Sequence, residues 1–263
     1  MKALVLVKPT PQTEAKIVAK PDGKGIEYAG VEFVINPYDE FAIEEAVKLK
    51  ESGKVTEVVL CTFGTPNHKE VILKGLAVGA DRAVLVDNQG CENFDSVSIA
   101  KVLAGVVKAE NPDFVLAGKQ AIDDDNMHIH TMVAELLNWP HVNVVAKLDL
   151  NGKTAKVERE VEGGQVEVYE VQLPCVLGAH KSLNKPRFAP LPGIMKARKK
   201  PFDIKKPADF GVDASALNAA PKARYTKFQP PPSKPAGKIF KGEPIEAMVN
   251  KVVDLLRNEA RVI

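Results

Sequence analysis

The segment Asn111–Leu137, NPDFVLAGKQAIDDDNMHIHTMVAELL, contains the residues whose types and spacing could do chemistry. Its apolar run Phe114–Ala117 predicts a buried strand, Gly118 a turn, and the remainder a polar loop followed by a helix. In open α/β sheets, ligands bind in the crevice between such a strand end and the next helix. A glycine lets the backbone approach a ligand closely, and free N–H groups at a helix start favour phosphate or carboxylate.

Three consecutive aspartates, Asp123–Asp125, restrict the kind of ligand. They would repel a phosphate unless their side chains turn away, whereas they suit ribose hydroxyls, helix capping or a metal. The chain contains neither GxGxxG nor GxxxxGK[ST], the usual dinucleotide and P-loop fingerprints. The segment therefore predicts either a nucleotide site of another type or an ordinary strand–loop–helix unit.

Catalytic constellations are absent from the sequence. There is no GxSxG motif, and the five histidines do not have metalloprotease spacing. His128 and His130 could bracket a metal with the aspartates, but residues i and i+2 of a helix diverge by about 200° and cannot share an ion there. We therefore expect no metal site and no enzyme, but a protein whose chemistry belongs to a bound cofactor.

Periodicity predicts an α/β fold: a parallel-sheet, Rossmann-like nucleotide-binding domain with a β-hairpin extension and an extended C-terminal arm. The first helix should have Asn36 as N-cap and Pro37 as its first residue. Parallel strands are expected at Ala3–Val7, Val58–Thr62, Ala83–Val86 and Phe114–Ala117, and further helices at Asn67–Val78, Val97–Glu110, Asn126–Leu137 and Pro244–Arg257. Antiparallel strands are expected at Val142–Leu150, Lys153–Glu160 and Gln165–Leu173, with hairpin turns at Asn151-Gly152 and Gly163-Gly164.

Charge and proline are concentrated near the C-terminus. Residues 181–241 contain 15 Lys or Arg, 3 Asp or Glu and 10 of the 19 prolines. Such a segment should not form a compact α/β core; we expect an extended arm over a partner's surface. A nucleic-acid arm is the rival interpretation, but its aromatic residues are few and follow no regular stacking pattern. The expected division is therefore a domain over 1–185 and an arm region over 186–263.

The rest of the composition predicts a cytoplasmic protein without membrane insertion. Hydrophobic residues make up 45% and charged residues 27%, which is ordinary for a globular protein. Apolar runs are shorter than the roughly 18 residues of a membrane span. The start, MKALVLVKP, reads as a strand rather than a signal peptide. Cys61, Cys91 and Cys175 are odd in number and widely spaced, which fits reduced thiols.

Three motifs occur in one order that resembles the electron transfer flavoprotein β subunit. They are NPYDEFAIEEAVKLKE (Asn36–Glu51), GKQAIDDD (Gly118–Asp125), and KVEREVEGGQVEVYEVQLPCV (Lys156–Val176) followed by LNKPRFAPLPGIMKARKK (Leu183–Lys200). The resemblance extends from about residue 1 to about residue 213 and fades in the proline-rich tail.

The resemblance implies a β subunit that forms a heterodimer with an α subunit. Such a protein accepts electrons from flavin dehydrogenases, such as the acyl-CoA dehydrogenases of fatty acid oxidation, and passes them to a quinone oxidoreductase. FAD lies mostly on the α subunit, and the β subunit binds AMP structurally. Matching motifs place the cofactor-binding residues at Leu6, Asn36, Pro37, Tyr38, Asp39, Phe63, Gly118, Lys119, Gln120, Ala121, Ile122, Asp123, Asp124, Asp125, Asn126, Met127, His128 and Ile129.

Several positions depart from the family pattern or select among its branches. Met127–His130 stands where the family commonly has Asn-Gln-Thr-Gly around the phosphate. Either His128 or His130 contacts the phosphate, or the ligand differs, or the site is empty. Asp124 stands where a bifurcating branch, with a second FAD in the β site, commonly has glycine, so the AMP-type branch is favoured. Tyr38 matches an aromatic residue near the flavin, and a second such aromatic is replaced by Thr13.

The loop Phe188–Lys200 resembles the loop by which the family docks on dehydrogenases, with Leu191 as its anchor. Prolines on both sides stiffen the loop, so less entropy is lost on docking. The expected partner-binding residues are Leu191, Pro192, Ile194, Met195, Lys196 and Lys199. Two rivals to this reading remain: the bifurcating subunit, and a stand-alone nucleotide-binding protein of the stress-protein type.

Overall fold

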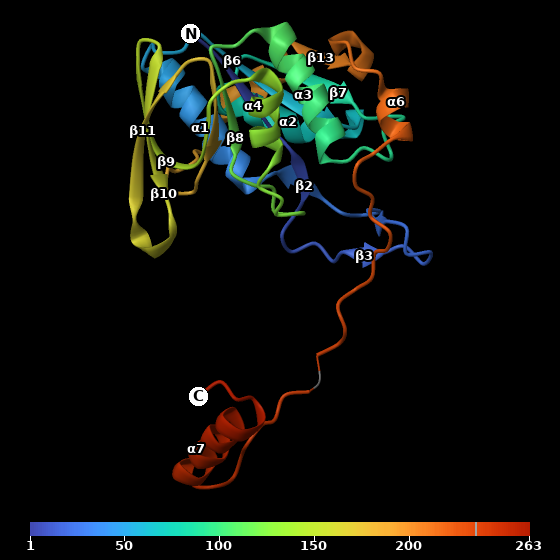
Figure 1. Ribbon diagram of the computed structural model, residues 1–263, viewed down its shortest axis with the longest axis vertical. Helices are drawn as coiled ribbons and strands as arrows, with labels where there is room; N and C mark the ends of the chain where they lie inside the picture. Colours follow the sequence, from blue (N-terminus) through green and yellow to red (C-terminus); the bar gives the residue numbers. More distant parts are fainter. Residues whose placement is uncertain (235) are drawn as a thin grey trace.

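The computed structural model describes residues 1–234 and 236–263 and consists of one large sheet with helices on both faces (Figure 1). The nine strands lie in the order β11-β10-β9-β12-β8-β1-β6-β7-β13. The parallel strands that the periodicity predicts are β1 (Lys2–Leu6), β6 (Glu57–Gly64), β7 (Arg82–Asp87) and β8 (Phe114–Gly118). The α/β, Rossmann-like fold class is confirmed.

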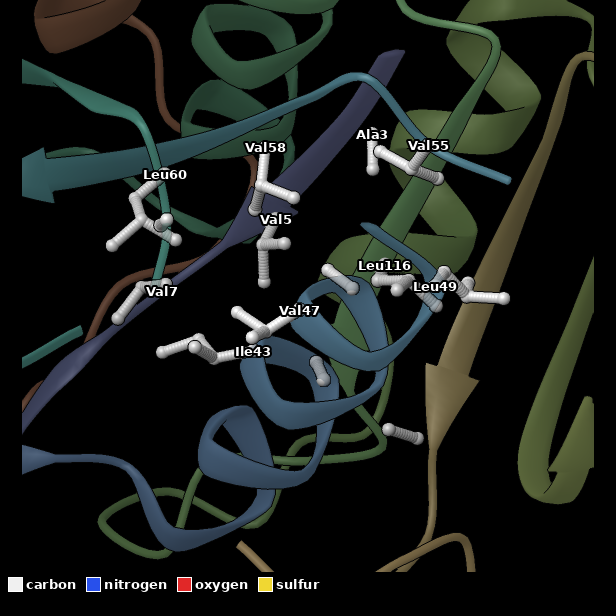
Figure 2. Packing of buried hydrophobic residues seen from close by; sticks show 14 of the residues in the cluster. Ala3, Val5, Val7, Ile43, Val47, Leu49, Val55, Val58, Leu60 and Leu116 are labelled. Atoms are coloured by element: carbon white, nitrogen blue, oxygen red, sulfur yellow. The ribbon is translucent and has the colours of Figure 1, made fainter. Parts of the chain in front are cut away.

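Helices cover both faces of the sheet. Successive side chains of a strand point to opposite faces, so alternate residues pack against different helices. Helices α1 (Pro37–Glu51) and α2 (Lys69–Val78), the latter preceded by a 3-10 turn η1 (Pro66–His68), share one core with Ala3, Val5 and Val7 (Figure 2). Helices α3 (Ser96–Glu110) and α4 (Ile129–Leu137) share the other core with Leu4 and Leu6. The period-two alternation of β1 thus supplies both layers from one strand.

The predicted hairpin extension is continuous with the parallel sheet. The middle strand of the extension, β10 (Thr154–Glu160), pairs antiparallel with β9 (His141–Asn151) on one side and with β11 (Val166–Gln172) on the other. A 3-10 turn, η2 (Glu162–Gly164), connects β10 to β11. On its other side β9 pairs in parallel with β12 (Cys175–Ala179). Strand β12, whose five residues are all buried, was not among the strands expected from the sequence.

The C-terminal region contributes one strand to the sheet. Strand β13 (Phe202–Lys205) pairs in parallel with β7 at the edge, within the range expected to be an arm. A proline precedes its four residues and a lysine ends them, and both residue types are tolerated at a sheet edge. A strand this short and polar gives no clear pattern in the sequence. A 3-10 turn η3 (Pro207–Phe210) and helix α6 (Ala214–Ala219) follow before the chain becomes extended.

Beyond α6 the arm runs past an excursion of the N-terminal region and ends in a helix set apart from the sheet (Figure 1). The excursion has two small pairs of strands, β2 (Pro9–Pro11) with β5 (Phe33–Ile35) and β3 (Val18–Ala19) with β4 (Ile26–Glu27). The last helix is α7 (Ile245–Asp254), continued by a π-helical turn η4 (Leu255–Glu259). Over residues 1–234 and 236–263, no helix combines the length and the apolar character that crossing a membrane requires.

Candidate functional site

A cavity of about 150 Å³ opens where β1, β6 and β8 end, between the starts of α1, α3 and α4. Carboxyl ends of parallel strands meet at one edge of a sheet, so side chains distant in sequence gather there. The cavity is lined by Leu6, Val7, Lys8, Asn36, Asp39, Cys61, Phe63, Ser96, Ile99, Leu103, Ala117, Gly118, Gln120, Ala121, Asp124, Asn126, Met127, His128, Ile129 and His130.

The Asp39 carboxylate joins three elements at the base of this cavity. It accepts hydrogen bonds from the backbone N–H of Lys8 (2.7 Å), the backbone N–H of Gly118 (3.0 Å) and the Asn36 carboxamide (2.9 Å). Burial raises the pKa of Asp39 to about 7, although the three donors favour the charged form and act in the opposite direction. A buried carboxylate with three N–H partners fixes the ends of β1 and β8 against the start of α1.

Gly118 leaves room for the first turn of helix α1. A Cβ at this position would lie 2.7 Å from the Tyr38 Cβ and would overlap the Asp39 carboxylate. The close approach that the glycine permits in this structure is that of the first turn of α1; its expected contact with a ligand stays a prediction. Gly118 also lines the cavity.

Asn36 occupies the N-cap position of α1, but its side chain does not cap the helix. Its carboxamide donates to the Gln120 carbonyl (2.8 Å) and accepts from the Ile122 backbone N–H (3.2 Å). The expected capping bond is therefore wrong, because the side chain reaches across to the loop between β8 and α4. Asn36 holds that loop against α1.

Two carboxylates of the aspartate run pair with Lys8 at the cavity. The Lys8 ammonium lies 2.7 Å from Asp123 and 3.0 Å from Asp124, and Asp125 accepts from the Gln120 side chain at 2.6 Å. Burial alone would lower the pKa of Lys8, but the two carboxylates raise it above its ordinary value. The positive charge at the cavity is thus already balanced by neighbouring carboxylates.

Helix α4 begins later than the sequence predicts. Asp125 and Met127 have left-handed backbone (φ 52° and 42°), so the chain cannot be helical before Ile129, three residues after the expected start at Asn126. No side chain caps the first turn of α4. Its amide N–H groups therefore remain available to an acceptor at the cavity.

An aromatic contact and a polar contact join the residues at the start of α3 to the end of β6 and to the start of α4. The ring of Phe63, at the end of β6, stacks on Phe94 at 5.8 Å between centroids and 11° between planes. The His128 Nε2 lies 2.7 Å from the Ser96 hydroxyl at the start of α3. These pairs place one aromatic face and one imidazole beside the same cavity.

His130 differs from His128 in charge and environment. It is only 3% exposed, and its Nε2 has no hydrogen-bond partner among the described residues. Burial lowers the pKa of His130 to about 4, so the ring is neutral near pH 7. The His130 ring therefore lines the cavity as a neutral group and offers no positive charge for a phosphate.

The structure separates the expected cofactor-binding residues into two groups. Most line the cavity, whereas Pro37, Tyr38, Lys119, Ile122, Asp123 and Asp125 do not. Tyr38 lies half-buried beside it, with the Lys119 ammonium 5.2 Å from its ring centroid. The lining residues absent from that expected set are Val7, Lys8, Cys61, Ser96, Ile99, Leu103 and Ala117, together with His130, which the sequence had suggested as an alternative phosphate contact. Lys8 follows a predicted strand directly, a signal that could have found it.

Metal binding has no support among the residues described, 1–234 and 236–263. No group of three or more His, Cys, Asp or Glu side chains there is placed to hold an ion. Cys61, Cys91 and Cys175 are all free thiols, and burial raises the pKa of Cys61 and of Cys175 to about 12. These two thiols are therefore protonated near neutral pH.

Comparison with known proteins identifies the family. Residues 25–209 match the profile of the Electron transfer flavoprotein domain. An electron transfer flavoprotein subunit beta of Bradyrhizobium diazoefficiens is 41% identical over the whole of both chains. The subunits named beta from Bacillus subtilis and Homo sapiens are 41% and 39% identical, over 100% and 98% of each chain. The chain belongs to the electron transfer flavoprotein family, among its β subunits.

The segment that resembles the dehydrogenase-docking loop of electron transfer flavoproteins contains a short helix. Helix α5 (Leu191–Ala197) takes Pro192 into its first turn, where proline fits a helix, so the expected loop is partly helical. Leu191 is 72% exposed and Met195 69% exposed. The other expected partner-binding residues, Pro192, Ile194, Lys196 and Lys199, are exposed as well.

Ion pairs hold this electron transfer flavoprotein segment against α1. The Arg187 guanidinium contacts Glu44, whose carboxylate is nearly buried, and also Glu51. Asn184 donates to the Phe41 carbonyl and to Glu45, both at 3.0 Å. Helix α1 thus borders the cavity at its first turn and anchors the chain just before α5, whereas α5 itself packs against α2.

Proposed function

We propose that this electron transfer flavoprotein β subunit pairs with an α subunit and carries electrons from flavin dehydrogenases, such as acyl-CoA dehydrogenases, to a quinone oxidoreductase. FAD would lie mostly on the α subunit and supply the redox chemistry. The similarity to β subunits over the whole chain carries this proposal. The free apolar side of α7 supports it: Ile245 is 76% exposed and Val249 52% exposed. An exposed amphipathic helix at the end of an arm suits burial against a second chain.

We infer that the cavity takes AMP. Phe63 and Leu6, at the ends of β6 and β1, offer apolar surface to a purine. The uncapped first turn of α4 and the imidazole of His128 are the groups suited to a phosphate. Because Lys8 is already paired with Asp123 and Asp124, we expect the phosphate to depend on these groups rather than on that ammonium.

The docking role of α5 is also a proposal. Leu191, Pro192, Ile194 and Met195 would contact an apolar pocket of a dehydrogenase, with Lys196 and Lys199 steering toward an acidic surface. Residues 1–185 would then bind nucleotide, and residues 186–263 would bind partners. We place the protein in the cytoplasm, for which its three free, buried thiols are the supporting observation.

The decisive experiment is co-expression with an α subunit of the same organism, followed by denaturation and identification of released nucleotides. One FAD and one AMP per heterodimer is the expected result. Two FAD would favour the bifurcating alternative. One FAD without AMP would reject the AMP proposal while leaving electron carriage intact. A flavin-free, monodisperse monomer as the dominant cellular form would reject the heterodimer and favour a stand-alone nucleotide-binding protein.

A further inference from the structure

Four consecutive residues that lead from the loop after β7 into the first turn of α3 alternate between the C-terminal region and the cavity. The backbone N–H of Asn93 donates to the Asn218 side chain of α6 at 2.8 Å. Phe94 stacks on Phe63, which lines the cavity. Asp95 faces the arm, and Ser96 pairs with His128 at 2.7 Å in the cavity. Neighbouring residues of one short turn therefore contact two sites that are distant in sequence.

The Asp95 carboxylate has two separate tasks, one for each oxygen. Its Oδ1 accepts the Ser98 N–H at 2.9 Å and caps α3. Its Oδ2 accepts the backbone N–H groups of Lys222 and Ala223, the latter at 3.1 Å, where the arm leaves α6. Burial of Asp95 acts in the opposite direction, but the bonds from Ser98, Lys222 and Ala223 lower its pKa to about 2. The carboxylate is therefore charged at physiological pH.

The residues that Asp95 holds are otherwise exposed. Lys222 and Ala223 lie on the surface in a stretch without regular secondary structure. A second bond ties the arm down further along, from the Phe228 N–H to the Gly23 carbonyl at 2.8 Å. Because the start of the arm lacks a helix or strand ladder of its own, a charge-assisted bond to one carboxylate is a large part of what fixes its direction.

We propose that Asp95 is a positioning residue that links the nucleotide cavity to the C-terminal arm, so that filling the cavity and fixing the arm favour each other. The proposal rests on the proposed function, in which the cavity takes AMP and the arm binds the α subunit. A ligand that orders His128 and Ser96 also orders the adjoining Asp95, which holds Lys222 and Ala223. By linkage, fixing the arm must strengthen nucleotide binding by the same factor.

The test uses the full-length chain purified with its α subunit and stripped of nucleotide, with AMP as the probe. Asp95→Asn keeps an oxygen that can cap α3, because Asn is a good N-cap, but presents an amide to the arm. Asp95→Ser is the second variant, which caps α3 and removes the second oxygen altogether. Asp113→Asn is the matched control, since Asp113 accepts the Lys2 N–H at 2.6 Å at the opposite ends of the strands. AMP affinity and hydrogen exchange at residues 222–223 are measured for each protein.

We expect AMP to slow exchange at residues 222–223 of the wild-type chain about fivefold, the lower end of ordinary linkage between sites. Both Asp95 variants should bind AMP about fivefold more weakly and lose the response of exchange to AMP, while Asp113→Asn behaves as wild type. Unchanged exchange on AMP binding, or wild-type AMP affinity in both Asp95 variants, would overturn the link alone. A wild-type complex that binds no AMP would overturn the nucleotide proposal and the link with it.

Discussion

At the scale of single residues, the cavity is held by groups whose partners are other parts of the protein. Asp39 accepts hydrogen bonds from the backbone of Lys8 and Gly118. Asn36 donates a hydrogen bond to the loop after β8. Such buried, satisfied groups fix geometry, and removing one partner leaves another unpaired. These bonds fix the side of the cavity formed by the start of α1 and the loop after β8.

Gly118→Ala tests whether that glycine serves the packing of α1. The added methyl group would lie 2.7 Å from the Tyr38 Cβ, so either α1 or β8 must shift. We expect a loss of about 1 to 3 kcal/mol in the free energy of unfolding, the usual cost of overpacking, measured by denaturant titration. Gly25→Ala, whose methyl group would lie no closer than 3.6 Å to its neighbours, should leave stability nearly unchanged. Equal stability of both variants and the wild type would contradict the assignment.

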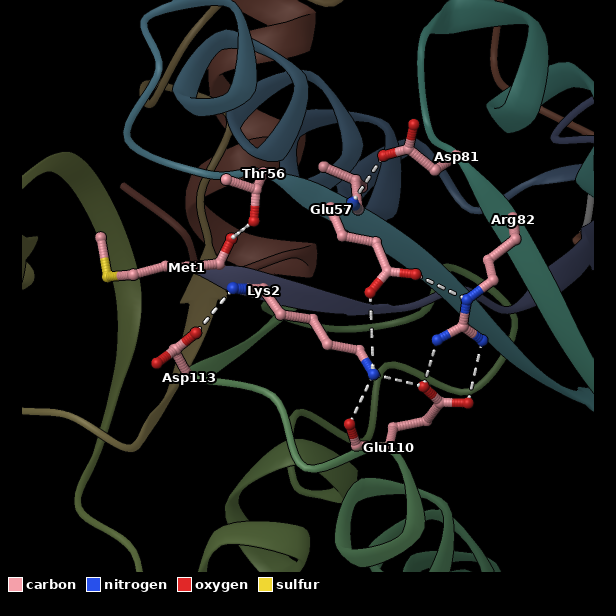
Figure 3. A network of polar contacts seen from close by, with 9 residues as sticks. Met1, Lys2, Thr56, Glu57, Asp81, Arg82, Glu110 and Asp113 are labelled. Carbon is pink, nitrogen blue, oxygen red and sulfur yellow. Dashed lines mark hydrogen bonds and ion pairs between the residues drawn. The ribbon is translucent and has the colours of Figure 1, made fainter.

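At the scale of elements, ion pairs fasten the amino ends of the strands to α3, on the side opposite the cavity. Figure 3 shows Lys2 of β1, Arg82 of β7 and Glu57 of β6 gathered around Glu110, the last residue of α3. Hydrogen bonds from Arg82, together with those from Lys2, lower the pKa of Glu110 to about 2 and outweigh the effect of burial. One carboxylate therefore joins a helix end to two strands.

Glu110 should make stability depend on pH in the acid range. Its pKa is lower in the folded chain than the ordinary value of 4.5, so its contribution is fully present above pH 4.5 and is lost as the pH falls toward 2. We expect Glu110→Gln to cost about 1 to 2 kcal/mol at pH 7, and the difference from wild type to shrink below pH 4.5. Denaturant titrations at several pH values measure both. A difference that stays constant down to pH 2 would exclude this role.

Helix α5 presents its apolar residues in a geometry that a partner could bind. Leu191→Ala should slow electron transfer from the partner dehydrogenase by weakening docking by about 2 kcal/mol, roughly thirtyfold in affinity. Flavin content should not change, because Leu191 lies on the surface and outside the cavity lining. Ile17→Ala, at another exposed apolar residue, is the control. Stopped-flow reduction of the flavoprotein measures the rates, and equal rates for Leu191→Ala and wild type would remove the docking role.

At the scale of the whole molecule, the sheet domain and the C-terminal helix have different sources of stability. The sheet buries two apolar layers, whereas α7 shares a groove with Ile239 and Phe240 of its own arm and leaves much of its apolar side exposed. Deleting residues 236–263 should leave the melting temperature of the isolated chain nearly unchanged and abolish co-purification with the α subunit. Retained co-purification would show that the arm's end is not needed for assembly.

The amino-acid sequence by itself determined the parallel strands, their crossover helices and the hairpins, because each of these has a local period or turn chemistry. It also determined the family, through motifs that keep their order. Only the tertiary structure decided that Asn36 crosses to the loop after β8, that Gly118 serves α1, and that β12 and β13 complete the sheet. It alone decided that burial keeps His130 neutral and that Asp95 meets Lys222 and Ala223. These features depend on contacts between residues far apart in the chain and on burial, neither of which has a local signature.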